Sequence, residues 1–251
     1  MDFKGLVLAL IILALAWGAA AAEPAKLSVP FAGHNRTYYL FVPGGGDGAL
    51  PMAVLLHGSG GNGLFMIQRW QDIATREHIV LLAPDSLHQD IGWDLANDGP
   101  DYIHATVQAA ADQHPIDFRR LYVFGQSGGA VYALNLAMLE SEYFAAAALH
   151  AGGWRKPPEY RYADYADRKI PVSMYVGDRD EYFSVTSVQA TLRILTQHGV
   201  PAELHLLPGR VHSYLDVPMD FHDTVWSFLK GNMLSGPPKF VSYRLPAAPP
   251  K

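Results

Sequence analysis

The sequence contains no cysteine, no run of basic residues and little net charge. Without cysteine, disulfide bonds cannot stabilise the chain and a lipid-modified cysteine is excluded. The 251 residues carry a net charge of −5 without a lysine or arginine cluster, which argues against a nucleic-acid partner. The length and the 49% hydrophobic content fit one globular domain with a sizeable core.

The longest apolar stretch lies at the N-terminus. The charged start DFK precedes GLVLALIILALAWG, and four alanines ending at Ala22 follow. A charged start, an apolar core and a small-residue site describe a secretory signal peptide over residues 1–22. An uncleaved membrane anchor is the alternative, but the terminal alanines insert weakly into a bilayer. We expect cleavage after Ala22, secretion or export to the periplasm, and no membrane attachment afterwards.

Apolar blocks alternate with helix-like segments along the rest of the chain. Strands are predicted at 27–33, 37–42, 52–56, 79–83, 120–124, 144–149, 172–176 and 202–207, and helices at 64–77, 101–113, 130–139, 185–198 and 220–230. Strands that are apolar throughout are typical of a parallel sheet covered on both faces. We therefore predict an α/β domain over 23–234, followed by a Pro-rich tail at 235–251 that is extended or disordered.

A serine stands between glycines where the strand at 120–124 meets the helix at 130–139. The turn reads GQSGG, with the serine at position 127. Such a strand-turn-helix junction holds a serine hydroxyl at the end of a sheet, and the helix N-terminus beneath it favours developing negative charge. The alternative is an ordinary glycine-rich turn that serves packing alone. The context favours a nucleophile at Ser127.

A serine hydroxyl becomes nucleophilic when a histidine accepts its proton and an acid orients that histidine. The strand at 172–176 runs into Asp178 and Asp180, and the strand at 202–207 runs into a turn and His212. The order Ser, Asp, His is expected of the α/β-hydrolase fold. Both aspartates are candidates for the acid. We favour Asp180, because it lies farther along the loop, whereas Asp178 is suited to a bond within the turn.

The glycine-rich segment HGSGGNG at 57–63 follows the strand at 52–56. It fits a dinucleotide fingerprint, but it also fits a loop whose backbone N–H helps to form an oxyanion hole. A nucleotide site gives no reason for a serine, an aspartate and a histidine to follow three strand ends in order. We therefore assign the oxyanion donors to Ser59 and Gly128 and expect neither a metal nor a cofactor.

These motifs resemble those of secreted α/β-hydrolases related to feruloyl esterases and poly(3-hydroxybutyrate) depolymerases, over roughly residues 35 to 230. The shared motifs are LLHGSGGN, W-x-x-x-A followed by APDS, GW, DYI, IDFRRLYVFGQSGG and FAAAALHAGG. The resemblance implies a catalytic triad of Ser127, Asp180 and His212. Many polymer-degrading members carry disulfides that this chain cannot form, and both small and polymer-linked esters stay open as substrates.

The sequence thus predicts a serine carboxylic-ester hydrolase that acts through an acyl-enzyme. A non-catalytic binding protein of this fold and a serine peptidase are the alternatives. The segment between the strands at 144–149 and 172–176 is too short for a large lid, which favours an open cleft. Aromatic residues in loops after strand ends favour an aromatic or bulky acyl group. These candidate substrate-binding residues are Trp93, Trp154, Tyr182, Phe183 and Tyr214.

Overall fold

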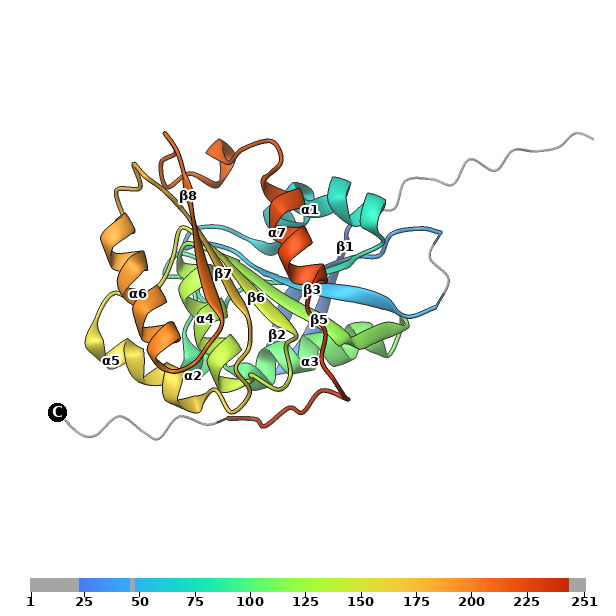
Figure 1. The fold of residues 1–251 in the computed structure, drawn as a ribbon. Coiled ribbons are helices and arrows are strands. Elements are labelled where there is room, and N and C mark those ends of the chain that lie inside the picture. The colour runs from blue at the N-terminus through green and yellow to red at the C-terminus, as the bar shows by residue number, and fades with distance from the viewer. Residues whose placement is uncertain (1–22, 46–47, 244–251) are drawn as a thin grey trace, which may run out of the picture.

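The computed structural model describes residues 23–45 and 48–243 (Figure 1). The predicted signal peptide and the cleavage site after Ala22 lie outside these residues, as does the end of the tail from residue 244 onward. Within the described ranges, none of the helices combines the length and the apolar character needed to span a bilayer.

Eight strands, seven helices and two 3-10 turns make up the described chain. The strands are β1 (Ala25–Phe31), β2 (His34–Phe41), β3 (Leu50–Leu56), β4 (Val80–Pro84), β5 (Ile116–Gln126), β6 (Ala146–His150), β7 (Val172–Gly177) and β8 (Ala202–Leu207). The helices are α1 (Gly63–Glu77), α2 (Leu95–Asp98), α3 (Pro100–Ala111), α4 (Gly128–Leu139), α5 (Pro157–Tyr160), α6 (Val185–Gln197) and α7 (Phe221–Lys230). The 3-10 turns are η1 (Arg161–Tyr165) and η2 (Tyr214–Asp216).

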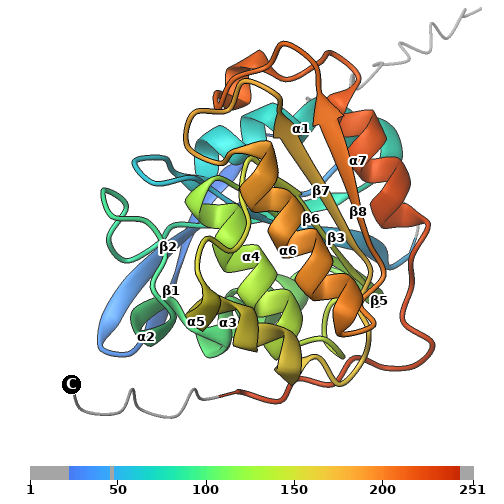
Figure 2. The same cartoon turned by 60° about the vertical axis from the view of Figure 1, so that its left-hand side comes forward.

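The strands form one sheet in the order β1-β2-β4-β3-β5-β6-β7-β8. Strand β1 pairs antiparallel with β2, and β2 pairs antiparallel with β4, whereas the six strands from β3 to β8 all run parallel to one another. Figures 1 and 2 show α1 and α7 on one face of the sheet and α3, α4 and α6 on the other. The predicted α/β-hydrolase fold is confirmed.

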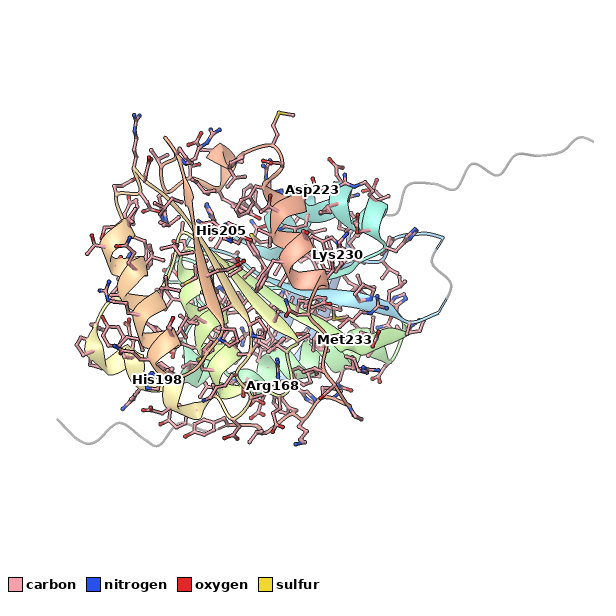
Figure 3. All side chains as sticks on the ribbon, viewed as in Figure 1. Arg168, His198, His205, Asp223, Lys230 and Met233 are labelled. Atoms are coloured by element: carbon pink, nitrogen blue, oxygen red, sulfur yellow. The ribbon has the colours of Figure 1, made fainter. Side chains whose placement is uncertain are left out.

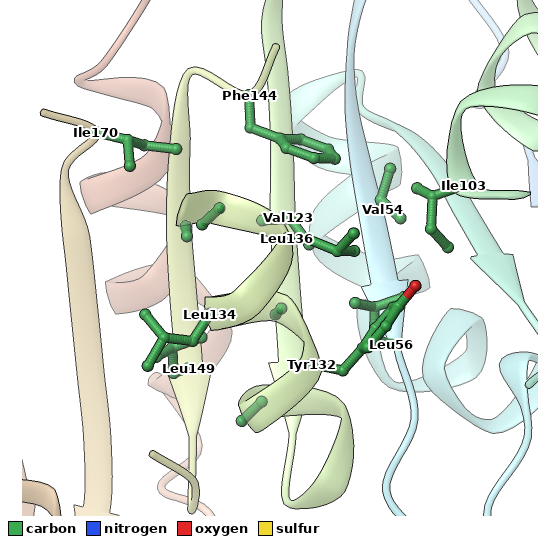
Figure 4. Close-up of a cluster of buried hydrophobic side chains, with 14 of the residues drawn as sticks. Val54, Leu56, Ile103, Val123, Tyr132, Leu134, Leu136, Phe144, Leu149 and Ile170 are labelled. Atoms are coloured by element: carbon green, nitrogen blue, oxygen red, sulfur yellow. The ribbon is translucent and has the colours of Figure 1, made fainter. Parts of the chain in front are cut away.

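Each face of the sheet has its own hydrophobic core, because successive residues of a strand point to opposite sides. In β3, Val54 and Leu56 face α3 and α4, while Leu55 faces α1. Figure 4 shows the first of these cores, with Leu134 and Leu136 of α4 among the strand side chains. The sheet is thus rigid at its centre, where β3, β5 and β6 end at the glycine-rich turns.

Helix α4 is apolar around almost its whole circumference. A helix of this kind has to be covered on all sides. The sheet covers its inner face, and η1 packs on its outer side. The segment between β6 and β7 is therefore a cover for α4 and not a helical lid over the strand ends.

The predicted elements agree with the structure except at several ends and in four short pieces. Strand β5 begins at Ile116 and not at residue 120, because Ile116 pairs with Leu50 beyond an irregular step in the register. Sequence analysis did not predict α2, α5, η1 and η2. These pieces have three to five residues each, too few for an apolar period to show.

Candidate active site

Ser127 lies in the sharp turn between β5 and α4. Its backbone has φ 54° and ψ −120°, in the region that residues other than glycine rarely occupy. The Ser127 N–H donates to the carbonyl of His150 at 2.9 Å, and the Ser127 carbonyl accepts from the N–H of Ala130 at 2.9 Å. The flanking strand and helix therefore hold the serine in this conformation.

Glycines at two positions of the turn are required by close approach of neighbouring backbone. A Cβ atom on Gly125 would lie 2.1 Å from the carbonyl oxygen of Gly129. A Cβ atom on Gly129 would lie 2.3 Å from the carbonyl oxygen of Leu56, at the end of β3. Any side chain at either position would push the serine turn away from the sheet.

Three side chains from separate loops form a continuous hydrogen-bond chain. The Oγ of Ser127 lies 2.8 Å from Nε2 of His212, and Nδ1 of His212 lies 2.9 Å from Oδ2 of Asp180. The carboxylate fixes the proton on Nδ1, which leaves Nε2 free to accept the serine proton. The Asp180 carboxylate also accepts from the N–H groups of Tyr182 and Phe183, at 2.9 and 2.7 Å. The acid is thus fully hydrogen-bonded and points at the imidazole.

Asp178, the other candidate acid, turns toward the neighbouring loop. Its carboxylate accepts from the N–H of Gly209 at 2.7 Å, and its own N–H donates to the Leu207 carbonyl at 3.2 Å. The loop after β7 is joined in this way to the loop after β8. Asp178 therefore sets the spacing of the two loops, while Asp180 contacts the histidine.

The two predicted oxyanion donors lie beside each other. A Cβ atom on Gly128 would lie 3.6 Å from the backbone nitrogen of Ser59. Within the described chain, neither the Gly128 N–H nor the Ser59 N–H donates to a protein acceptor. The Ser59 hydroxyl donates instead to the Ile91 carbonyl, at 3.1 Å. Two free N–H groups next to the serine suit an oxygen that becomes negative during attack on a carbonyl.

A buried histidine supports the loop that carries Ser59. His57 donates from Nδ1 to the carbonyl of Gly58 at 2.8 Å, and its Nε2 accepts from the N–H of Ser86 at 3.2 Å. Burial lowers the pKa of His57, so the ring is neutral and keeps this tautomer. Trp93 donates to the His57 carbonyl at 2.8 Å. The loop is therefore fixed by both its side chain and its backbone.

A cavity of about 780 Å³ opens beside Gly128, one of the two predicted oxyanion donors. Its wall on the α4 side is formed by one face of that helix, from Gly128 at the start to Leu139 at the end. Trp93 stacks on Tyr132 across the cavity wall, with ring centroids 4.9 Å apart and an interplanar angle of 13°. We call this cavity the α4 groove. Its other walls include Phe31 of β1, Tyr162 of η1 and Tyr243 near the C-terminus.

The five aromatic residues predicted to bind substrate fall into different places. Trp93 lines the α4 groove, and Tyr182 is 64% exposed beside the His212 ring. Trp154, Phe183 and Tyr214 are at most 4% exposed. Of the five candidate substrate-binding rings, these three are therefore buried and do not line the α4 groove. The loops after β6, β7 and β8 turn these three rings inward, where they pack beneath the site.

Each of the three buried rings has a supporting contact. Trp154 donates from Nε1 to the side-chain oxygen of Asn135, at 2.9 Å, and so fixes a residue of the α4 groove. Phe183 stacks on the His212 ring, with centroids 5.9 Å apart. Tyr214 accepts from Trp70 Nε1 at 2.8 Å. Trp154 and Phe183 thus support residues of the site, whereas Tyr214 packs in the core beneath it.

Two histidines, the buried His150 and the half-buried His222, lie under the catalytic loops. The Tyr214 hydroxyl lies 2.9 Å from Nε2 of His222 and, since it accepts from Trp70, donates to that nitrogen. Burial lowers the pKa of His222 to about 4 and that of His150 to about 3. His150 packs against Tyr214 and Phe221. Both rings are therefore neutral in the folded protein near pH 6, where the unfolded chain binds protons.

We expect the free energy of unfolding to fall as the pH is lowered from about 6.5 toward 4. The unfolded chain takes up protons on His150 and His222 over this interval, while the folded protein excludes them, so each histidine contributes about 1 kcal/mol per pH unit near pH 5. Urea unfolding of the wild type and of His222→Gln at pH 7, 6 and 5 measures this slope. The amide oxygen of the introduced glutamine can accept from Tyr214, and the variant should show the smaller slope. Equal slopes would contradict the assignment.

The other histidines singled out in the sequence have structural partners. His198 closes α6 and His205 lies on the edge strand β8 (Figure 3). Their Nε2 atoms lie 3.0 Å from carboxylate oxygens of Asp164 and Glu203, respectively. Neither ring contacts the serine turn by a hydrogen bond in the described part of the chain, so His212 is the histidine that the fold brings to Ser127.

Most of the α4 groove could not be predicted from the sequence. Its walls come from β1, α2 with the loop before it, the start of α3, α4, η1 and the C-terminal segment, which are far apart in the chain. One signal was available, because Asn135 is a polar residue in an otherwise apolar helix directly after the serine turn. A polar side chain on such a helix marks a face that borders either solvent or a ligand.

Comparisons with known proteins agree with this fold. The model of the dienelactone hydrolase family matches residues 84–222. Feruloyl esterase B of Thermothelomyces thermophilus is 29% identical over 133 residues, which cover 47% of this chain and 44% of that relative. The chain thus spans less than half of the relative's length.

Solved structures with low sequence identity share the α/β-hydrolase fold. Est1E of Butyrivibrio proteoclasticus has a TM-score of 0.62 at 17% identity, with 82% of this chain and 96% of that chain covered. The acylaminoacyl peptidase of Pyrococcus horikoshii has a TM-score of 0.69 at 14% identity, with 90% and 44% covered. At these identities the likeness concerns the fold alone.

Proposed function

The chain belongs to the dienelactone hydrolase family, and from this premise we propose that it hydrolyses carboxylic esters through an acyl-enzyme formed on Ser127. The hydrogen-bond chain from Ser127 through His212 to Asp180 carries the proposal. A serine in this arrangement can lose its proton at the moment of attack, and the buried carboxylate stabilises the imidazolium that results.

The reaction proceeds in two halves. The Ser127 Oγ attacks the carbonyl carbon while its proton moves to Nε2 of His212. The bond to the alcohol oxygen then breaks, and the same proton passes from His212 to the leaving alcohol. A water molecule, deprotonated by His212, attacks the acyl-enzyme and releases the carboxylic acid and the serine hydroxyl. In each half, the N–H groups of Ser59 and Gly128 receive the negative oxygen.

The position of His212 indicates where the alcohol group and the acyl group of the ester would bind. The imidazole must reach the leaving alcohol, so the alcohol lies toward the loops after β7 and β8, near the exposed Tyr182 ring. The α4 groove includes Gly128 and, within the described part of the chain, no residue of those two loops. The acyl group therefore enters the α4 groove.

The aromatic wall of the groove favours an aromatic acyl group. The half-buried Trp93 ring, backed by the stacked and buried Tyr132, presents a flat apolar surface, and the shape suits an aryl-acrylate ester of the feruloyl type. The likeness to feruloyl esterase B supports the same substrate class. A hydroxyalkanoate ester, small or polymer-linked, is the second candidate from the motifs of the sequence, and the open rim beside Tyr182 leaves room for either kind of alcohol.

We expect p-nitrophenyl cinnamate to be hydrolysed with a kcat/KM about tenfold higher than that of p-nitrophenyl acetate, because its ring packs on Trp93. Steady-state rates on both esters, on a hydroxybutyrate ester and on a peptide p-nitroanilide measure the preference. A burst of nitrophenol equal to the enzyme concentration tests the acyl-enzyme. Equal rates on cinnamate and acetate would remove the aromatic preference, and faster cleavage of the anilide would favour the peptidase alternative.

A further inference from the structure

The α4 groove extends far beyond the serine. Its residues on α4 are Gly128, Val131, Tyr132, Asn135 and Leu139, which recur at the spacing of one helix face. Leu139 lies eleven positions after Gly128, about 16 Å along the helix axis. The groove therefore has a far end, near the C-terminus of α4, that a short acyl group attached to Ser127 does not reach.

The chain's own C-terminal segment is seated at this far end. Glu140, the residue after α4, is 1% exposed, and its carboxylate accepts from the N–H of Val241 at 2.8 Å and of Tyr243 at 3.0 Å. Ser242 donates from Oγ to the Asp101 carboxylate at the start of α3. A buried carboxylate is stable when it is well hydrogen-bonded, so the segment is tied to α4 by a built contact.

Further contacts hold the segment on either side of this bond. Lys239 forms an ion pair with Glu142 at 2.7 Å, and Phe240 stacks on His104 with ring centroids 3.9 Å apart. The Tyr243 ring packs on Tyr165 of η1, at 4.6 Å between centroids, and lines the groove. The segment from 239 to 243, which we call the C-terminal strap, thus places one aromatic ring in the wall of the acyl groove.

We infer that the C-terminal strap is a specificity element and that Tyr243 sets the length of the acyl group that the groove accepts. The inference rests on the proposed function, because it takes the groove to hold the acyl side of an ester. Glu140 is a positioning residue in this arrangement, since it anchors the strap to the same helix whose first residue supplies an oxyanion donor. The distance along α4 from Gly128 to the strap thus limits the length of the acyl group.

The experiment is an acyl-length series of p-nitrophenyl esters, from acetate through butyrate and octanoate to dodecanoate, with the full chain and two variants of opposite size. Tyr243→Ala removes the ring and should raise the ratio of kcat/KM for dodecanoate to that for octanoate about tenfold. Tyr243→Trp enlarges the ring and should lower the same ratio. Acetate, which does not reach the strap, serves as the internal reference for each variant.

Val241→Ala is the matched control. Val241 is 55% exposed in the same strap, and its substitution keeps the backbone bond to Glu140. The control should leave the whole series unchanged. A uniform loss of activity across all chain lengths, or a ratio that does not move in opposite directions in the two Tyr243 variants, would overturn the inference and leave the strap a purely structural element.

A second measurement separates this inference from the proposed function. Calorimetric titration of dodecanoate into the wild type and the two Tyr243 variants reports on the groove without any chemistry. Affinities that change in opposite directions in the two variants support the strap even if no ester is hydrolysed, in which case the proposed function alone fails. Affinities unchanged by either substitution, together with an unchanged length series, overturn the inference while hydrolysis itself persists.

Discussion

Replacement of Ser127 by alanine is expected to lower kcat for p-nitrophenyl acetate by at least about 10⁴-fold, while the protein stays folded. The Oγ atom is the group that bonds to the substrate carbon, and the His212 Nε2 atom, at 2.8 Å, has no other hydroxyl to activate in the observed contacts. Alanine has the same Cβ as serine, so the strained backbone at φ 54° is disturbed little. Steady-state rates measure the loss of kcat, and circular dichroism shows whether the variant stays folded.

Ser59→Ala is the matched control for this substitution. Ser59 donates its hydroxyl to the Ile91 carbonyl, but its proposed role uses only the backbone N–H, which alanine keeps. The control should lose less than about tenfold in kcat, since removal of an oxyanion donor itself costs about 10²- to 10³-fold. A fluorophosphonate should label the peptide that contains Ser127 in the wild type and in the control. Undiminished hydrolysis by Ser127→Ala would end the proposal of a serine acyl-enzyme.

Asp180→Asn should lower kcat by about 10⁴-fold with little change in stability. The Asp180 carboxylate accepts from Nδ1 of His212 and, through Oδ1, from the N–H groups of Tyr182 and Phe183. An asparagine can keep the loop bonds with its oxygen, but its NH₂ group then faces Nδ1 and favours the tautomer with the proton on Nε2. That tautomer cannot accept the serine proton.

Asp178→Asn tests whether the loss of kcat is specific to Asp180 or follows from the loss of any negative charge in the loop. Asp178 binds the N–H of Gly209, which an amide oxygen can also accept, and it makes no contact with His212 in the described structure. We expect less than about tenfold loss in kcat. Rates measured between pH 5 and 9 separate a change in the histidine from a change in loop position. An equal loss of kcat in both variants would contradict the assignment of Asp180 to His212 and of Asp178 to the loop contact.

The serine turn and the order of the site residues could be predicted from the sequence because their causes are local. Gly125 and Gly129 are needed for close backbone approach, and small residues at a strand-to-helix junction show this in any sequence. The aspartate and the histidine follow strand ends, and the ends of parallel strands share one edge of a sheet. The sequence left both Asp178 and Asp180 as candidates, and the loop geometry brings Asp180 into contact with the histidine.

The walls of the α4 groove could not be predicted, because no local pattern connects them. Phe31, Tyr162 and Tyr243 meet only after the sheet and α4 have been assembled. Loop position alone also failed to decide which aromatic rings are open. Trp93, Trp154 and Tyr214 all stand in loops, and each has a polar atom hydrogen-bonded inside the protein, yet of the three only Trp93 lines the α4 groove. Tertiary packing, and not sequence position, determines such burial.

Ser127 and His212 are 85 residues apart in the sequence, and His212 follows β8, the last strand at one edge of the sheet. An unfinished or truncated chain that has not yet added β7 and β8 therefore carries an inert hydroxyl. Turnover of a chromogenic ester would therefore report whether the chain has completed the sheet. Hydrolytic activity in this sense measures the fraction of fully folded protein.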